Sequence, residues 1–159
     1  MSKNRTIHLA GAMALAAALA LATLSAPAGA AALSESHDPL GLIADNGANC
    51  EAAAGAYVMA GWNLIDGNNM PNNLIGGPGP DFTRAWGGND FADGLGANDI
   101  ICLGSGNDVG EGGSGNDVIY GQQGADQLLG QNGNDHLDGG PQMDNCVGGL
   151  GADTAFSCP

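Results

Sequence analysis

Residues Gly112–Tyr120, which read GGSGNDVIY, contain the pattern that decides this fold. An Asp recurs at every ninth position between residues 81 and 153, usually with a glycine five and another two residues before it. The position two residues after the Asp is mostly apolar. The nine aspartates are Asp81, Asp90, Asp99, Asp108, Asp117, Asp126, Asp135, Asp144 and Asp153.

Composition alone would suggest a disordered chain, because it has 29 glycines and only 4% aromatic residues. The strict period argues against that interpretation. If Asp filled about one position in ten by chance, nine consecutive matches to one grid would be extremely rare. The stretch is therefore interpreted as an internal structural repeat.

The glycines of the repeat predict regular backbone bends. The one five residues before the Asp is replaced by Ala85 and Leu103, and the one two residues before it by Ala97 and Gln142. Continuing the grid backwards places Asn72 and Asn63 at the Asp position, so the ladder is expected to begin near Gly61. Two nine-residue units then make an eighteen-residue coil, with three-residue strands that pair in parallel sheets between coils.

Residues eighteen apart should form columns along this stack. The predicted inward columns are Thr83, Ile101, Ile119, Leu137 and Ala155 on one side, and Ala92, Gly110, Leu128 and Cys146 on the other. At about 1.5–3 kcal/mol per buried aliphatic side chain, this thin core cannot outweigh an ordering cost of about 1–2 kcal/mol per residue. Another source of stability is required.

The aspartates are that source. They are expected in two rows, Asp81, Asp99, Asp117, Asp135 and Asp153 on a first edge and Asp90, Asp108, Asp126 and Asp144 on a second edge. Carboxylates about 4.8 Å apart repel each other by roughly 1 kcal/mol in water and more in a drier site. A divalent cation between successive carboxylates turns this repulsion into a net attraction. Carboxylate and carbonyl oxygens in flexible bends favour Ca²⁺ over Mg²⁺ or zinc.

These repeats resemble the RTX, or haemolysin-type, calcium-binding nonapeptide repeat. The resemblance implies an all-β protein, a parallel β-roll (a right-handed β-solenoid), with Ca²⁺ held between turns. It implies ligation by the nine Asp carboxylates and by turn carbonyls of the first glycines, Gly76, Gly94, Gly112, Gly121, Gly130 and Gly139. If each site uses aspartates two repeats apart, up to about seven sites result, four on one edge and three on the other. Pro141–Asp144 lacks the glycine before its Asp and is expected to bind weakly or not at all.

Three regions are predicted along the chain. Residues 1–30 are typical of a cleaved secretory signal, since Lys3 and Arg5 precede an apolar run too short to span a membrane comfortably. Residues 31–60 are an irregular segment that caps the open end of the array, and His37 within it is expected to be solvated. Residues 49–61 fit a short helix or an irregular strand equally well. Residues 61–159 are the β-roll, degenerate over 61–75 and clear over 76–156.

Charge restricts the partners. The net charge is −14, and the mature chain would keep Arg84 as its single Lys or Arg, against seventeen acids. Such a chain cannot neutralise nucleic-acid phosphates and is repelled by anionic membranes, so no nucleic acid and no membrane span are expected. Its natural partner is a cation.

Four cysteines in an exported chain predict two disulfides, and Cys146–Cys158 with Cys50–Cys102 is the favoured pairing. Zinc is the weaker alternative, because no cysteine pair has CxxC spacing. Asp93, Glu111, Asp138 and His136 are expected to be solvent-exposed side chains on the outer faces of the strands.

No nucleophile with a base and no phosphate-binding loop is evident, so an enzyme is not predicted. The expected function is a secreted, extracellular calcium-binding protein that folds on binding several Ca²⁺ ions and loses structure below about pH 4–5. Alternatives are a calcium-rigidified adhesion or structural module, with an unknown surface or polysaccharide partner, or an accessory to a separately encoded secreted enzyme.

Overall fold

The computed structural model describes residue 39 and residues 50–159, apart from the side chains of residues 51 and 52. The predicted signal segment, His37 and most of the predicted cap lie outside the described residues. One helix, α1 (Cys50–Met59), is followed by eleven strands. The strands are β1 (Asn63–Asn68), β2 (Asn73–Ile75), β3 (Asp81–Trp86), β4 (Phe91–Asp93), β5 (Ile100–Ser105), β6 (Val109–Ser114), β7 (Val118–Gln123), β8 (Gln127–Asn132), β9 (His136–Asp138), β10 (Asn145–Leu150) and β11 (Thr154–Phe156).

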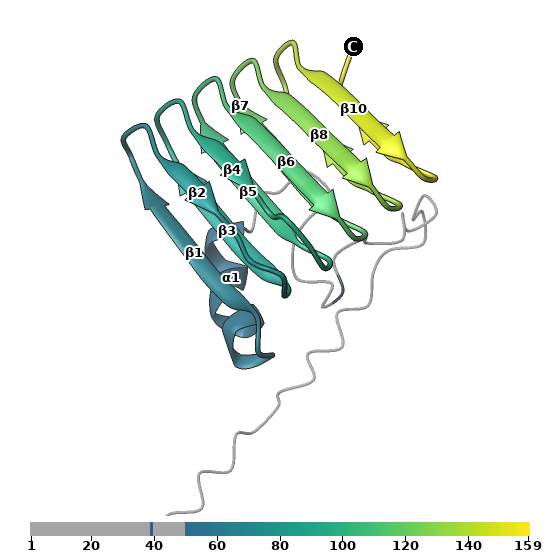
Figure 1. The fold of residues 1–159 in the computed structure, drawn as a ribbon. Coiled ribbons are helices and arrows are strands. Elements are labelled where there is room, and N and C mark those ends of the chain that lie inside the picture. The colour runs from purple at the N-terminus through teal and green to yellow at the C-terminus, as the bar shows by residue number, and fades with distance from the viewer. Residues whose placement is uncertain (1–38, 40–49) are drawn as a thin grey trace, which may run out of the picture. The chain divides into compact units, whose positions relative to one another are not determined.

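The strands alternate between two parallel sheets (Figure 1). One sheet has the order β1-β3-β5-β7-β9-β11 and the other β10-β8-β6-β4-β2. Residues pair with those eighteen positions away, for example Ile101 with Ile119 and Ala92 with Gly110. The predicted all-β parallel solenoid is confirmed, with about five turns. Its first coil carries Asn63 opposite Asp81.

Seven strands have six residues, where the sequence predicted three. In β5 and β7 the pairing continues beyond the first bend, with Gly104 opposite Gln122. Successive coils bend in the same way at the same position, so their backbone hydrogen bonds resume after the bend. A short sequence run therefore underestimates the length of the sheet.

The interior between the sheets contains most of the predicted core, namely Ala92, Ile101, Ile119, Leu128 and Leu137, with Cys146 at its margin. It also contains Leu74, Ala85 and Leu103, which the predicted columns did not include. The prediction for Ala155 is wrong, because this residue is exposed on β11, the last strand of its sheet.

A second apolar cluster lies on the outer face of the six-stranded sheet, where α1 packs. The Tyr57 ring stacks on Phe82 at 4.8 Å between centroids and meets Trp62 edge-on at 4.9 Å. Ile100, Cys102, Val118 and Tyr120 extend this cluster across three strands. Residues 50–59 are thus a helix, and it covers a sheet face, whereas the sequence predicted that it closes the end of the array.

Both predicted disulfides are present. Cys50–Cys102 ties α1 to β5, with 6.2 Å between the Cα atoms. Cys146–Cys158 closes the last coil, with 5.9 Å between the Cα atoms.

His136 and Asp138 are buried, so the expectation that they are exposed is wrong. Both lie on the outer face of β9, in columns with Val118 and Tyr120. The His136 ring lies 3.0 Å from the Thr154 hydroxyl through Nδ1 and 5.2 Å from the Phe156 ring centroid. Asp93 and Glu111 are half-buried on the other sheet.

The second glycine of the repeat permits the coils to stack. At Gly124 the backbone φ is +143°, and a Cβ would lie 1.4 Å from the Gly106 carbonyl oxygen in the preceding coil. We expect Gly124→Ala to lower the free energy of unfolding by about 3 kcal/mol or more, because the two coils would have to separate. Denaturant unfolding in calcium measures this loss.

Gly79→Ala is the matched control. Gly79 occupies the same position of its repeat, yet a Cβ there would meet no atom within 4 Å. Its substitution should change the unfolding free energy by less than about 1 kcal/mol. Equal losses in the two variants would contradict the stacking explanation.

Candidate metal centres

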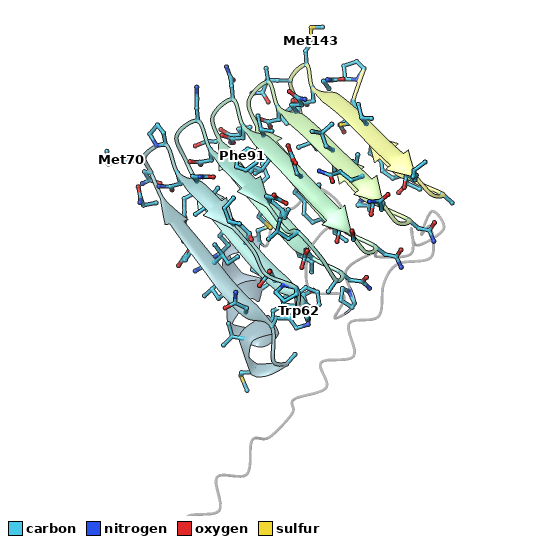
Figure 2. The ribbon with its side chains drawn as sticks, in the orientation of Figure 1. Trp62, Met70, Phe91 and Met143 are labelled. Atoms are coloured by element: carbon cyan, nitrogen blue, oxygen red, sulfur yellow. A yellow bond between two sulfur atoms is a disulfide. The ribbon has the colours of Figure 1, made fainter. Side chains whose placement is uncertain are left out.

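The nine aspartates lie at the turns, in the two predicted rows. All except Asp153 are buried, although they carry carboxylates. The turns of the second edge all lie on one side of the stack, where Met70 and Met143 mark its first and last members in Figure 2. Turns of the first edge lie on the opposite side.

One oxygen of each Asp ties two coils together. The Oδ1 atom accepts a hydrogen bond from the backbone N–H eighteen residues earlier; Asp99 bonds Asp81 in this way at 2.8 Å, and Asp117 bonds Asp99 at 2.8 Å. The same bond recurs from Asp90 to Asp153 at 2.7–3.0 Å. At the first coil Asp81 instead accepts from the Asn63 side-chain amide at 2.7 Å.

The other carboxylate oxygen lacks a protein partner in most of these aspartates, whereas Asp81 Oδ2 accepts the Gly77 N–H at 2.6 Å. The Oδ2 atom is buried without a hydrogen bond among the described residues in Asp90, Asp99, Asp108, Asp117, Asp126, Asp135 and Asp144. A buried polar atom without a partner is costly, and a buried charge more so. A row of such oxygens requires a cation or protons.

The first glycine of the repeat leaves space beside this oxygen. A Cβ at Gly76 would lie 2.5 Å from Asp81 Oδ2 and 2.5 Å from the Gly94 carbonyl oxygen of the next coil. A Cβ at Gly130 would lie 2.4 Å from Asp135 Oδ2 and 2.6 Å from the Gly148 carbonyl oxygen. We call this space, bounded by a carboxylate and a carbonyl oxygen, a cradle. These distances show how closely the carboxylate and carbonyl oxygens approach each other across two coils and do not give the position of an ion. Oxygen donors of these two kinds, held in glycine-rich bends, suit calcium, which takes carboxylate and carbonyl ligands in flexible geometry.

A comparison with protein families agrees with this geometry. The model of the RTX calcium-binding nonapeptide repeat matches in four copies, over residues 66–101, 75–110, 103–137 and 120–155. The chain belongs to this family. No curated protein and no solved structure matches it.

The RTX repeat is a structural calcium-binding motif and not a catalytic one. Within residues 50–159, no three His, Cys, Asp or Glu side chains gather as a metal cluster. Carbonyl oxygens would therefore have to complete each RTX site. None of the described helices is long and apolar enough to cross a membrane.

Burial raises the pKa of six RTX aspartates. The pKa of Asp99 rises from 3.8 to about 8, mainly because burial removes the carboxylate from water. The hydrogen bond from the Asp81 N–H lowers this pKa, whereas the neighbouring Asp117 and Asp81 carboxylates raise it further. Desolvation likewise raises the pKa of Asp117 and Asp126 to about 7 and of Asp108 to about 6. The pKa values of Asp90 and Asp135 are also raised by burial. Bare carboxylates are thus unfavourable here near neutral pH.

A second ladder, which the sequence reasoning missed, supports the RTX turns. Asn98 Oδ1 accepts the Asn116 N–H at 2.8 Å, and Asn116 Oδ1 accepts the Asn134 N–H at 2.8 Å. These bonds reach toward the following coil, whereas the Asp bonds reach toward the preceding one. The signal was the recurrent Asn immediately before the Asp.

Proposed function

We propose that this protein is a secreted calcium-binding β-roll that folds when it binds several Ca²⁺ ions. The observation that carries the proposal is the set of seven buried Asp Oδ2 atoms without protein partners among the described residues, five of which lie next to a first glycine. A bound cation supplies the partner that these oxygen atoms lack. Because its ligands come together only when coils stack, the free energy of binding contributes directly to folding.

The proposed ligands are the carboxylates of the nine repeat aspartates and the carbonyls of the first glycines. The carboxylates are those of Asp81, Asp90, Asp99, Asp108, Asp117, Asp126, Asp135, Asp144 and Asp153, and the carbonyls those of Gly76, Gly94, Gly112, Gly121, Gly130 and Gly139. One carboxylate thus links two coils through its Oδ1 hydrogen bond and presents Oδ2 to the metal. We infer no catalytic role, since the repeat is a structural motif.

An extracellular location suits this function. Two disulfides, Cys50–Cys102 and Cys146–Cys158, are typical of proteins outside the reducing cytosol. Extracellular calcium modules bind with dissociation constants of about 10⁻⁴–10⁻³ M, which matches the calcium available there. The N-terminal residues 1–30 support export by a cleaved signal.

Isothermal titration of the mature, oxidised protein at pH 8 tests the proposal. Calcium should bind at several sites per chain, and magnesium at the same concentrations should bind far more weakly, because it demands a rigid octahedron. Absence of calcium binding up to about 10 mM, well above the range of extracellular modules, would refute the function.

One substitution locates the sites. Asp117→Asn keeps an oxygen that can accept the Asp99 N–H but removes the charge at the middle of the first edge. We expect at least one fewer bound calcium and a rise in the calcium midpoint of about tenfold, since a carboxylate ligand becomes neutral.

Asp93→Asn is its control. Asp93 is a half-buried carboxylate on the outer face of β4 that belongs to neither row, although its charge acts on Asp99, and its Oδ1 accepts the Leu95 N–H at 3.0 Å. The control removes one negative charge and should leave the calcium count unchanged. An equal loss in both variants would indicate a general effect of net charge and contradict the assignment.

A further inference from the structure

The two edges of the roll differ at the first-glycine position. On the first edge every coil has glycine there: Gly76, Gly94, Gly112, Gly130 and Gly148. On the second edge the corresponding residues are Gly67, Ala85, Leu103, Gly121 and Gly139. Two consecutive coils of the second edge thus carry a side chain where the other coils have none.

A side chain at this position occupies the cradle. At Gly94 a Cβ would lie 2.4 Å from Asp99 Oδ2 and 2.7 Å from the Gly112 carbonyl oxygen. At Gly121 it would lie 2.6 Å from Asp126 Oδ2 and 2.5 Å from the Gly139 carbonyl oxygen. A cation bound between these oxygens and a methyl group cannot share that space.

Ala85 and Leu103 have such a Cβ, and the interior of the roll has adapted to them. Both side chains are fully buried, with 0% exposure, and belong to the core between the sheets. The Leu103 Cδ1 atom lies 3.1 Å from where a Cβ of Gly110 would be, so Leu103 fills the gap that this small residue leaves. Aliphatic packing here replaces the contribution that calcium makes in other coils.

We propose that the calcium sites are distributed unequally, with four on the first edge and one on the second. The inference rests on the proposed function and concerns which of its sites exist. Rows of five and four aspartates have seven intervals between successive coils, and Ala85 and Leu103 close two of them. The site that remains on the second edge lies between the coils of Gly121 and Gly139.

The closed intervals adjoin Asp90 and Asp108. Their Oδ1 atoms accept the Asn72 N–H and the Asp90 N–H, both at 2.7 Å, as in the other coils. These two aspartates therefore retain their link between coils. Their Oδ2 atoms are buried without a partner among the described residues, as in the other repeats, so without a metal each carboxyl must hold a proton. They lie in the turns between β3 and β4 and between β5 and β6, where α1 and the Cys50–Cys102 disulfide also support the six-stranded sheet.

Counting bound calcium by native mass spectrometry tests the inference on the full mature, oxidised chain. Wild type should hold five ions. Ala85→Gly removes one methyl group and should open one site, giving six. Gly94→Ala makes the reverse change at the equivalent position of the first edge and should give four. Leu103→Gly should also give six, with a lower unfolding temperature because the core loses its side chain.

The results separate this inference from the proposed function. A wild-type chain that binds no calcium refutes both. A wild-type chain that binds seven ions, or an Ala85→Gly variant that keeps the wild-type count while its circular dichroism matches wild type, overturns only the unequal distribution. If a variant does not fold, the count for wild type and for the other variants still decides between five and seven.

Discussion

Removal of calcium from the oxidised protein at pH 8 is expected to abolish most of its β-sheet circular dichroism. Without the metal, Asp99, Asp117 and Asp126 have pKa values of about 7–8 in the folded state. Holding them ionised at pH 8 opposes folding, because burial favours the protonated form. A small domain has a stability of only about 5–15 kcal/mol, so several such groups in one chain oppose its folding substantially.

Adding calcium back in excess of the chelator should restore the signal, and an equal concentration of magnesium should not. The Cys50–Cys102 disulfide persists during this cycle, so α1 stays tethered to β5 and refolding should be reversible. A β-sheet signal that is unchanged after chelation would contradict the coupling of metal binding to folding.

The stability of the calcium-free chain is expected to depend on pH in the direction opposite to that of the calcium-bound chain. A carboxyl whose folded pKa is raised contributes stability below its unfolded pKa, near 3.8, and loses that contribution as pH rises through its folded pKa. For these groups the loss begins near pH 4 and is complete at about pH 6 for Asp108, about pH 7 for Asp126 and Asp117, and about pH 8 for Asp99. The calcium-free chain should therefore gain β-sheet signal between pH 8 and pH 4.

With calcium the carboxylates must stay ionised, so acid displaces the metal. The calcium midpoint should change little from pH 8 to about pH 5 and rise steeply below about pH 4–5, where the unfolded chain takes up protons. Circular dichroism of calcium-stripped and calcium-saturated samples across pH 4–8 measures both trends. A calcium-free chain that becomes more structured as pH rises would contradict the raised pKa values.

Much of the roll follows from local sequence. Asp at every ninth position with two framing glycines dictates identical bends, and identical bends force residues eighteen apart into columns. That is why Ile101 and Ile119, the two Asp rows and the Cys146–Cys158 bridge were predictable before any coordinates. The same reasoning predicted strands that are too short, because pairing beyond a bend depends on the backbone of the neighbouring coil.

Other features depend on contacts between distant segments. Phe82 and Tyr120 point outward from the core between the sheets, and they are buried because Tyr57 of α1 and the following Trp62 lie in the cluster on that face. The buried state of His136 and Asp138 has the same origin, because burial on an outer face depends on what packs there. The role of the repeated Asn also emerged only when coils were stacked.

The sequence by itself determined the coil, its two edges and the oxygen chemistry that favours calcium, because period, glycine and carboxylate are local properties. It showed Ala85 and Leu103 only as replacements of the first glycine. Tertiary structure decided what those two residues do, since only stacked coils place a Cβ in the space between one coil's carboxylate and the next coil's carbonyl. In the proposed distribution of sites, the two side chains that interrupt the glycine pattern pack where the other coils bind calcium.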